Sequence, residues 1–136
     1  MVEITKGMSQ FLSEPNLATV ATIRRSGSPH LTYVWVLQEG NDLLFTATRD
    51  RIKTKNIVRD NRAAVAVYDP KNHQRFFIAE GKVEITDDRD YSFYARIGTK
   101  YVPPERAKAG AEAARQRGEK RVILRLKPYR VFSRGV

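Results

Sequence analysis

The chain has 136 residues, the length of one domain, and 41% of them are apolar, which is enough to bury a core. Its 25 Lys and Arg residues outnumber 15 Asp and Glu residues, and the net charge of +10 favours anionic partners such as phosphates and carboxylates. The absence of cysteine excludes disulfides, thiolate catalysis and cysteine-ligated metals, and it fits a cytoplasmic protein. The sequence contains no run of about 20 apolar residues, so a membrane is not an expected partner.

The first part of the chain predicts a short helix followed by three strands. Residues 4–13 have the apolar spacing of an amphipathic helix. Residues 17–25 and 30–38 are rich in alternating β-branched residues and flank a Ser-Gly-Ser turn, and 42–48 follow another glycine turn. Such short loops predict that these three strands pair as an antiparallel meander.

A basic segment follows the third strand. Residues 48–62, TRDRIKTKNIVRDNR, contain six basic and two acidic residues and predict a helix over 50–59. Asp50 is expected to cap this helix, and Ile52 and Ile57 to anchor it to the sheet. Free N–H groups at a helix N-terminus, together with Arg and Lys side chains, can hold a phosphate. The alternative is a solvated basic helix.

The rest of the chain predicts two strands, two helices and a last strand, over 63–69, 75–85, 88–98, 103–118 and 121–133. Gly81 inside a long strand predicts a bulge or bend, and Asp87 or Asp88 is placed to cap the first of the two helices. Pro128 suits an edge or a bend. The whole pattern predicts one domain, 1–136, mainly β with peripheral helices: a six-stranded antiparallel Greek-key barrel, closed or nearly so.

Four segments of the chain occur in the order seen in one protein family: NLATVATIRRSGSPHLTYVWV, LLFTATRDRIKTKNIVRDNRAAVAV, FFIAEGKVEI and RVILRLKPYRVF. The first two are the most specific, since they combine a strand, a glycine turn before proline, a second strand and R-x-K-x-x-N at the start of a helix. With them the chain resembles the flavin/deazaflavin oxidoreductase superfamily, the split β-barrel relatives of pyridoxamine 5′-phosphate oxidase that include F420-dependent enzymes. The resemblance covers almost the whole chain.

The resemblance implies a homodimer with cofactor sites between the subunits. In the family the R-x-K-x-x-N segment contacts the cofactor phosphate, which implies roles for Arg51, Lys53 and Asn56, with Lys55 nearby. The cofactor ring usually lies against the second and third strands, here at Thr32, Tyr33, Val34, Trp35, Thr46, Ala47 and Thr48. The partner subunit commonly closes the site, and Phe77 is a candidate for that contact. From the residues alone, the threonines are ordinary strand residues and Trp35 suits a core or an interface.

The resemblance also implies the chemistry, an oxidoreductase that uses coenzyme F420 for hydride transfer to a small conjugated or anionic acceptor. Flavins and deazaflavins perform the hydride chemistry themselves, so the lack of a catalytic triad or paired carboxylates is expected and no catalytic residue is assigned. Coenzyme F420 carries a phosphate and a poly-glutamate tail, which suit the net charge of +10. An FMN-binding oxidase or reductase of the same fold is the alternative.

A third interpretation is a cofactor- or polyanion-binding protein without turnover. Nucleic acid is not an expected partner, because the aromatic residues lie in apolar strand runs rather than among Lys and Arg. No metal site is expected, since the two histidines lack ligand spacing, and no Rossmann or P-loop motif is present. Tyr91 and Tyr94 either pack on the barrel or line a substrate pocket. The basic residues around the second late helix either attract a carboxylate-bearing substrate or the acidic tail of a deazaflavin, or form a solvated face: Arg106, Lys108, Arg115, Arg117, Lys120 and Arg121.

Overall fold

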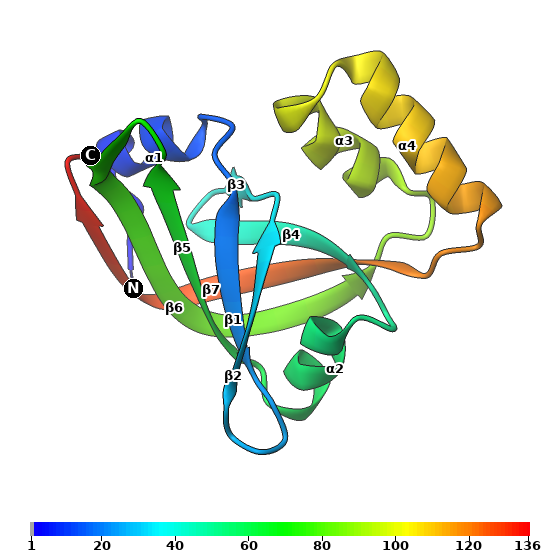
Figure 1. Ribbon diagram of the computed structural model, residues 1–136, viewed down its shortest axis with the longest axis horizontal. Helices are drawn as coiled ribbons and strands as arrows, with labels where there is room; N and C mark the ends of the chain where they lie inside the picture. Colours follow the sequence, from blue (N-terminus) through cyan, green and yellow to red (C-terminus); the bar gives the residue numbers. More distant parts are fainter. Residues whose placement is uncertain (1) are drawn as a thin grey trace.

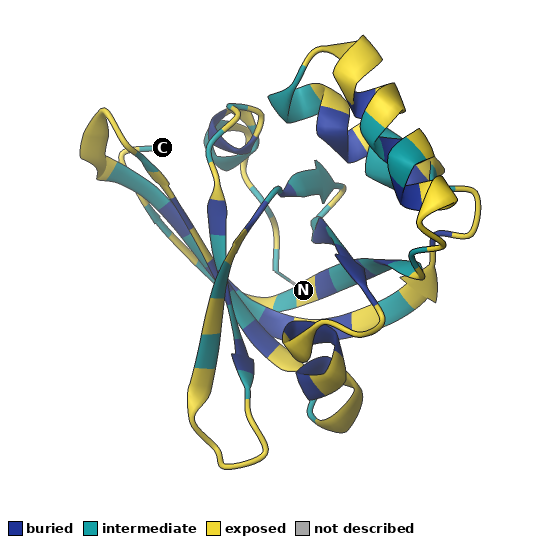
Figure 2. Cartoon of the chain, turned by 45° about the vertical axis from the view of Figure 1, so that its right-hand side comes forward, coloured by how far each residue is buried: buried dark blue, intermediate teal, exposed yellow. Residues whose placement is uncertain are grey.

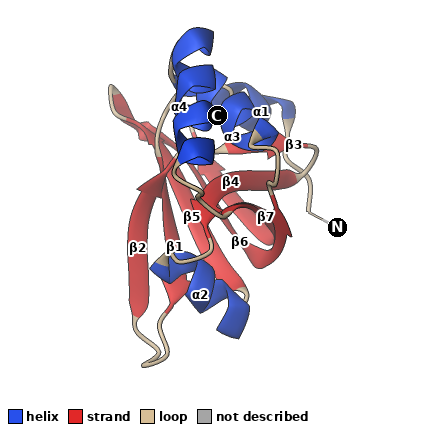
Figure 3. Ribbon diagram, turned by 90° about the vertical axis from the view of Figure 1, so that its right-hand side faces the viewer, coloured by secondary structure: helices blue, strands red, loops and turns tan. Residues whose placement is uncertain are grey.

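Antiparallel strands form one seven-stranded sheet, in the order β2-β1-β5-β6-β7-β4-β3, in the computed structural model, which describes residues 2–136 (Figure 1). The strands are β1 (Ala18–Ile23), β2 (Pro29–Val34), β3 (Leu37–Glu39), β4 (Asp42–Thr48), β5 (Arg62–Asp69), β6 (Asn72–Asp87) and β7 (Arg121–Arg134). The helices are α1 (Lys6–Leu12), α2 (Ile52–Arg59), α3 (Ser92–Tyr101) and α4 (Pro104–Gln116). Helix α2 covers one end of the rolled sheet, and the other three helices lie toward the opposite end (Figure 3).

The predicted strand 30–38 is in fact two strands, so the sheet has seven strands rather than six. Strand β2 pairs with β1 and β3 pairs with β4, which places them at the two ends of the sheet order, although only Trp35 and Val36 separate them in the chain. The predicted three-strand meander is therefore wrong. The chain crosses from one end of the sheet to the other at these two residues, and the barrel stays split between β2 and β3.

Helix α3 supplies the hydrogen bonds that Val36 loses by leaving the ladder. The Val36 N–H donates to the Tyr101 hydroxyl at 3.0 Å, and the Val36 carbonyl accepts from Lys100 Nζ at 2.7 Å. Lys100 Nζ also donates to the Leu12 carbonyl at 2.6 Å, and the Tyr101 hydroxyl lies 2.9 Å from the Asn16 carbonyl, which accepts from it. A backbone segment without strand partners needs such bonds when it is buried. The C-terminal end of α3 thus holds the crossing in place.

We expect the stability of the protein to rise with pH between about pH 8 and 10.5 through Lys100, because burial lowers the pKa of this amine from 10.5 to about 8. Over that window the unfolded chain binds more protons than the folded one, so the free energy of unfolding increases with pH. A neutral amine keeps two N–H donors for the two carbonyls it contacts. Urea unfolding of wild type and Lys100→Met at pH 7.5 and 9.5 should show a steeper rise for wild type.

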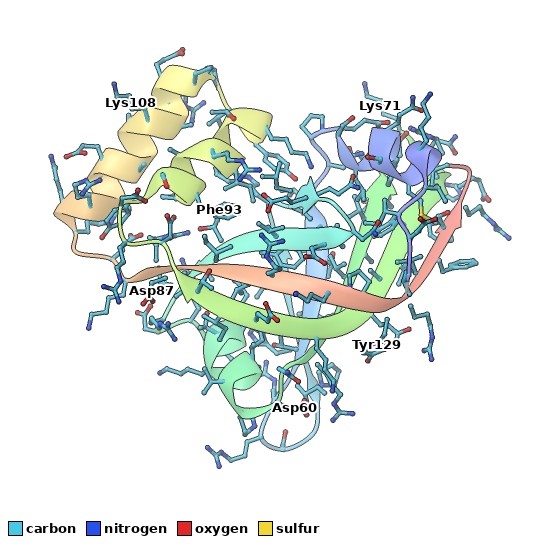
Figure 4. The ribbon with its side chains drawn as sticks, turned by 180° about the vertical axis from the view of Figure 1, so that it is seen from behind. Asp60, Lys71, Asp87, Phe93, Lys108 and Tyr129 are labelled. Atoms are coloured by element: carbon cyan, nitrogen blue, oxygen red, sulfur yellow. The ribbon has the colours of Figure 1, made fainter. Side chains whose placement is uncertain are left out.

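Lys108→Met is the matched control, because Lys108 is exposed on α4, where its side chain extends away from the sheet (Figure 4). This variant should keep the pH dependence of wild type. Equal pH slopes for wild type and Lys100→Met would contradict the assignment.

Alternating residues of the strands build the core on the inner face of the sheet (Figure 2). Phe45, Phe77 and Leu124 are at most 1% exposed there, and Phe11 of α1 closes one end. A smaller cluster on the outer side of β4 joins Leu44 to the α3 helix, where Phe93 lies between helix and strand (Figure 4). The burial of apolar side chains such as these is the main favourable contribution to folding.

The bulge predicted at Gly81 is confirmed. The register between β6 and β7 shifts between Glu80 and Gly81, and a Cβ on Gly81 would lie 2.3 Å from the Lys127 carbonyl oxygen. Pro128 faces Gly81 beyond Leu126, where the pairing of β7 with β4 ends. Because β4 no longer pairs with β7 at Pro128, the missing N–H of this proline removes no hydrogen bond to β4. This is expected for a proline at an edge or bend.

Capping at the two helix starts differs from the predictions in part. The N-cap of α2 is Arg51, with no side-chain cap bond, and Asp50 instead accepts a hydrogen bond from Thr48 Oγ1 at 2.5 Å. Of the two predicted anchors, Ile57 is buried but Ile52 is 52% exposed. The N-cap of α3 is Tyr91, and the predicted Asp88 caps the helix from three residues earlier.

The Asp88 carboxylate accepts the N–H groups of Phe93 at 3.1 Å and Tyr94 at 2.9 Å, which caps the α3 helix at a later start than predicted. Asp88 is 3% exposed, so these two bonds offset the burial of its carboxylate. The cap also sets where the first turn of α3, with Tyr94, lies above the sheet.

Candidate functional site

A cavity of about 320 Å³ lies between the edges of the split barrel. Strand β3 pairs only with Asp42–Leu44, so the rest of β4 has no partner on that side. The cavity is lined by Leu17, Tyr33, Val34, Trp35, Thr46, Ala47, Arg51, Lys53, Tyr94 and Arg121. Its walls thus come from β2, β4, the start of α2, the first turn of α3 and the start of β7.

Most of the predicted site residues meet at this cavity. Strand β2 and the crossing, the end of β4 and the start of α2 together bring Tyr33, Val34, Trp35, Thr46, Ala47, Arg51 and Lys53 to it. They come from segments far apart in the chain, and the split in the barrel is what places them around one space. Their contact with a cofactor remains a prediction.

Three other predicted residues are not part of the cavity lining. Thr48 donates to Asp50, and Asn56 Nδ2 donates to Thr22 Oγ1 at 3.0 Å beneath the helix. Thr32 faces the inner side of β2, where its Oγ1 is buried and lacks a hydrogen-bond partner among residues 2–136. The hydrogen bond from Asn56 to Thr22 connects α2 to β1, so Asn56 has a structural role.

The remaining two predicted residues are not at the cavity. Lys55 is exposed on the far side of α2 from Lys53, as its position two residues later on a helix requires. Phe77 is 0% exposed in the core of the barrel. Its ring is a packing residue, because the register of β6 with β5 turns it inward opposite Val67. A contact from Phe77 to a partner's cofactor would require opening the core.

Three residues that line the cavity were not among the predicted site residues: Leu17, Tyr94 and Arg121. Arg121 lies more than sixty residues after the basic helix in the sequence, and Thr48, next to α2, pairs with it across β4 and β7. No motif marks these positions. The aromatic character of its segment was the only sign that Tyr94 could line a pocket. The basic character of its segment was the only sign that Arg121 could attract a carboxylate.

The cavity carries three cationic side chains and no carboxylate. Lys53 is 8% exposed, and no described residue forms an ion pair with its ammonium group. Burial lowers the pKa of Lys53, and the positive charges of Arg51 and Arg121 lower it further. A buried cation without a partner is unfavourable, so an anion placed in this cavity would relieve both burial and repulsion.

Aromatic rings form one wall of the site. Trp35 is stacked against Tyr101 with ring centroids 5.3 Å apart and planes 7° apart, and against Tyr94 at 6.5 Å and 29°. The Arg121 guanidinium lies 3.9 Å from the centre of the Tyr94 ring. The position of this wall depends on α3, whose last residues also hold the crossing. Flat walls of this kind suit a planar ring system.

Other classes of site find no support in residues 2–136. No group of three or more His, Cys, Asp or Glu side chains that could hold a metal ion occurs in this part of the chain. In the same residues, no helix has the length and apolar character needed to cross a membrane.

A second recess, of about 560 Å³, adjoins Arg121 and includes Arg49 and Asp87, which pair at 2.8 Å. Asp87 marks this recess at the end of β6 (Figure 4).

Comparisons with known proteins agree with the fold. A solved structure described as an F420 reductase is 29% identical, covers 95% of this chain and 98% of its own, and has a TM-score of 0.77. A conserved hypothetical protein from Mycobacterium tuberculosis is 23% identical over 98% of this chain and 88% of its own, with a TM-score of 0.79. A haem storage protein from Vibrio cholerae, 14% identical, covers 98% and 96% with a TM-score of 0.72.

The same fold therefore serves proteins described in quite different terms, and fold alone does not set function. Curated proteins provide no match to this chain. The family model described as pyridoxamine 5′-phosphate oxidase matches residues 4–135. Because that match spans nearly the whole chain and the split barrel has the expected architecture, the chain belongs to the pyridoxamine 5′-phosphate oxidase family.

Proposed function

We propose that this protein is an oxidoreductase that binds coenzyme F420 and transfers a hydride between it and a small conjugated acceptor. The observation that carries the proposal is Lys53, a cation 8% exposed and without a counter-ion among the described residues, in a cavity that also contains Arg51 and Arg121. The positive electrostatic field of these three side chains favours the binding of a phosphate. Its volume of about 320 Å³ lies at the lower end of the range for small-molecule sites, which is about 300–1,000 Å³.

The start of α2 is suited to the phosphate. No side chain caps this helix, so the N–H groups of its first turn, which lack intrahelical partners in any helix, remain available. The positive end of the helix dipole adds to the charges of Arg51 and Lys53. Arg51 would contribute a bidentate contact and Lys53 a point charge. These two side chains and the backbone would then fix the phosphate end of the cofactor.

The remaining walls suit the ring of the cofactor. Trp35 and Tyr94 offer aromatic surface, and Tyr33 closes the side nearest β2. A bound deazaflavin or flavin supplies the hydride chemistry, and the chain binds the ring, orients it and excludes water. Thr46 Oγ1, which accepts from Arg121 at 2.8 Å, can use its own hydroxyl proton toward a ring acceptor. No side chain is assigned as a proton donor.

Coenzyme F420 is preferred to FMN on two grounds. A solved relative, 29% identical over 95% of this chain, is described as an F420 reductase. The net charge of +10 also suits the poly-glutamate tail of that coenzyme. The class of substrate, the lack of nucleic-acid binding and the cytoplasmic location remain predictions made from the sequence.

The test is a pair of fluorescence titrations of the purified protein with coenzyme F420 and with FMN. Trp35 is the only tryptophan and lines the cavity, so a ring bound beside it should quench its emission. We expect tighter binding of F420 than of FMN. Preference for FMN would move the protein to the flavin branch of the family, and binding of neither would refute the cofactor role.

We also propose that the protein is a homodimer through the outer face of the sheet. Apolar side chains that are more than half exposed gather there from the segment before β1 and from β2, β5 and β7: Leu17, Leu31, Tyr33, Tyr68 and Phe132. Small residues separate them, since Thr19 pairs with Tyr33 on one side and with Ala66 on the other. Large exposed apolar patches mark interaction surfaces.

A second copy is the occupant that this face favours. Leu17 and Tyr33 belong both to the exposed apolar face and to the cavity lining. A partner on that face would therefore also cover the open side of the cavity, which explains why Tyr33, 77% exposed in one chain, lies at a binding site.

A further inference from the structure

We propose that Arg121 binds the ring of the cofactor, whereas Arg51 and Lys53 bind its phosphate. This inference rests on the proposed function and assigns a separate part of the same cavity to a residue on a different element. Arg121 begins β7, and the other two cations belong to the start of α2. Arg121 therefore reaches the cavity from a different element than the other two cations.

The guanidinium of Arg121 is held in one position. Its side chain is 9% exposed, Nη1 lies 3.0 Å from Glu119 Oε1, and Nη2 donates to Thr46 Oγ1 at 2.8 Å. The face of the group lies 3.9 Å from the centre of the Tyr94 ring. A charged group fixed on three sides does not adapt to different ligands, and the direction of its Nε–H bond is set.

The Nε–H donor of Arg121 is unused. Arg121 Nε is buried and has no hydrogen-bond partner among residues 2–136. Buried donors are nearly always paired in folded proteins, so an unpaired N–H on a residue that lines the cavity is a candidate donor to a ligand atom. A carbonyl oxygen or an ionised oxygen of a heterocyclic ring is an acceptor suited to a single N–H donor.

The partners of Arg121 place it at the ring end. Tyr94 and Thr46, which it contacts, both line the cavity and belong to the walls rather than to α2. The phosphate already has Arg51, Lys53 and the uncapped start of α2. Arg121 therefore acts on a different part of the ligand.

Charge balance supports the same division. A phosphate monoester such as that of FMN carries a charge of about −1.5 to −2 at neutral pH, and the diester of coenzyme F420 carries about −1, so neither offsets all three cations in the cavity. Glu119, which pairs with Arg121 at 3.0 Å, is shared with Arg117 at 2.8 Å, so one carboxylate faces two guanidinium groups. Positive charge therefore remains at Arg121, and it would stabilise negative charge on the ring. We expect the ring hydroxyl of a bound deazaflavin to ionise at lower pH than it does in water, because Arg121 favours the ionised form.

The experiment compares ligands with and without the phosphate on the same variants. FMN is paired with riboflavin, and coenzyme F420 with its phosphate-free deazaflavin core. Arg121→Met should weaken the phosphate-bearing and phosphate-free members of a pair by the same factor, about tenfold. Lys53→Met should weaken only the phosphate-bearing member. Arg117→Met should leave both unchanged, because Arg117 also pairs with Glu119, at 2.8 Å, but lies outside the cavity lining.

A second measurement is the absorbance of the bound deazaflavin as a function of pH. The ring hydroxyl should ionise at higher pH in Arg121→Met than in wild type. Arg121→Lys keeps the positive charge but lacks the Nε–H group, so it should lose affinity for both members of a pair while retaining most of the low ionisation pH. If the methionine variant fails to fold, the lysine variant provides the same comparison of ligands.

Three results would overturn the inference. Selective loss of the phosphate-bearing ligand in Arg121→Met would make Arg121 a third phosphate contact. Unchanged affinity for both ligands would remove it from the site. A wild-type protein that binds none of the four ligands would refute the proposed function as well, which distinguishes that failure from the first two, where wild type binds.

Discussion

Lys53→Met is expected to weaken binding of coenzyme F420 and of FMN by about 10- to 100-fold and at the same time to stabilise the protein without ligand. Lys53 is 8% exposed, lies near two other cations and has no counter-ion among the described residues. Methionine removes the charge and keeps most of the length of the side chain. The affinity loss reflects the missing charge-assisted bond to the phosphate, and titration of Trp35 fluorescence measures it.

The gain in stability has a defined dependence on pH. Burial and the neighbouring cations lower the pKa of Lys53 from 10.5, so between its lowered value and 10.5 the unfolded chain binds more protons than the folded one. The free energy of unfolding of wild type therefore rises with pH in that window, and at pH 7 the charged Lys53 still destabilises the fold. Urea unfolding should show Lys53→Met to be the more stable protein at pH 7 and the less pH-dependent one.

Lys55→Met is the matched control for both measurements. It removes the same charge from the same helix, but from a side chain that is exposed and does not line the cavity. We expect its affinity and its stability to stay near those of wild type. If the two methionine variants lowered cofactor affinity equally, the effect would come from net charge and not from a phosphate site at Lys53.

Ala66→Arg is expected to convert the protein from dimer to monomer and to lower its affinity for the cofactor. Ala66 is exposed at the centre of the outer face, where it pairs with Thr19 and lies opposite Ile78 on β6. Two copies of a charged side chain would be buried against an apolar surface, and the cost of burying unpaired charge exceeds the gain from the contact. Light scattering after size-exclusion chromatography measures the mass.

Cofactor affinity should fall in the same variant, because Leu17 and Tyr33 lie both on this face and in the cavity lining. Ala109→Arg is the control, since Ala109 is exposed on α4 and away from the strands of the outer face. It makes the same chemical change and should leave both mass and affinity unaltered. A wild-type protein that is monomeric at all concentrations, or an Ala66→Arg variant that stays dimeric, would refute the dimer.

Sequence patterns that repeat over short distances predicted most of the elements. The strand at Asp42–Thr48 has the predicted bounds, and β5 and β7 differ from theirs by one residue at a single end. Alternation of period two is written in neighbouring residues, so it is readable without the fold. The bulge at Gly81 was likewise predictable, because a glycine inside a long strand often marks a bulge or a bend.

The break at Trp35 and Val36 was not predictable from the same patterns. Residues 30–38 alternate as one strand would, and what divides them is a set of bonds from Lys100 and Tyr101, more than sixty positions away in the chain. Those bonds exist only once α3 lies on the barrel. The error about the meander has the same cause, since strand order depends on contacts that no local period encodes.

For the site, the sequence by itself determined the basic helix after the third strand and, through the family resemblance, Arg51 and Lys53 as phosphate candidates. Tertiary structure alone decided that Lys53 is buried at a cavity while Lys55 is exposed, and that Phe77 belongs to the core. It also brought Arg121 from the last strand beside Tyr94 and Thr46. The physical reason is that charge and periodicity are properties of a segment, whereas burial and an unpaired donor depend on which distant segments the closing of the barrel brings together.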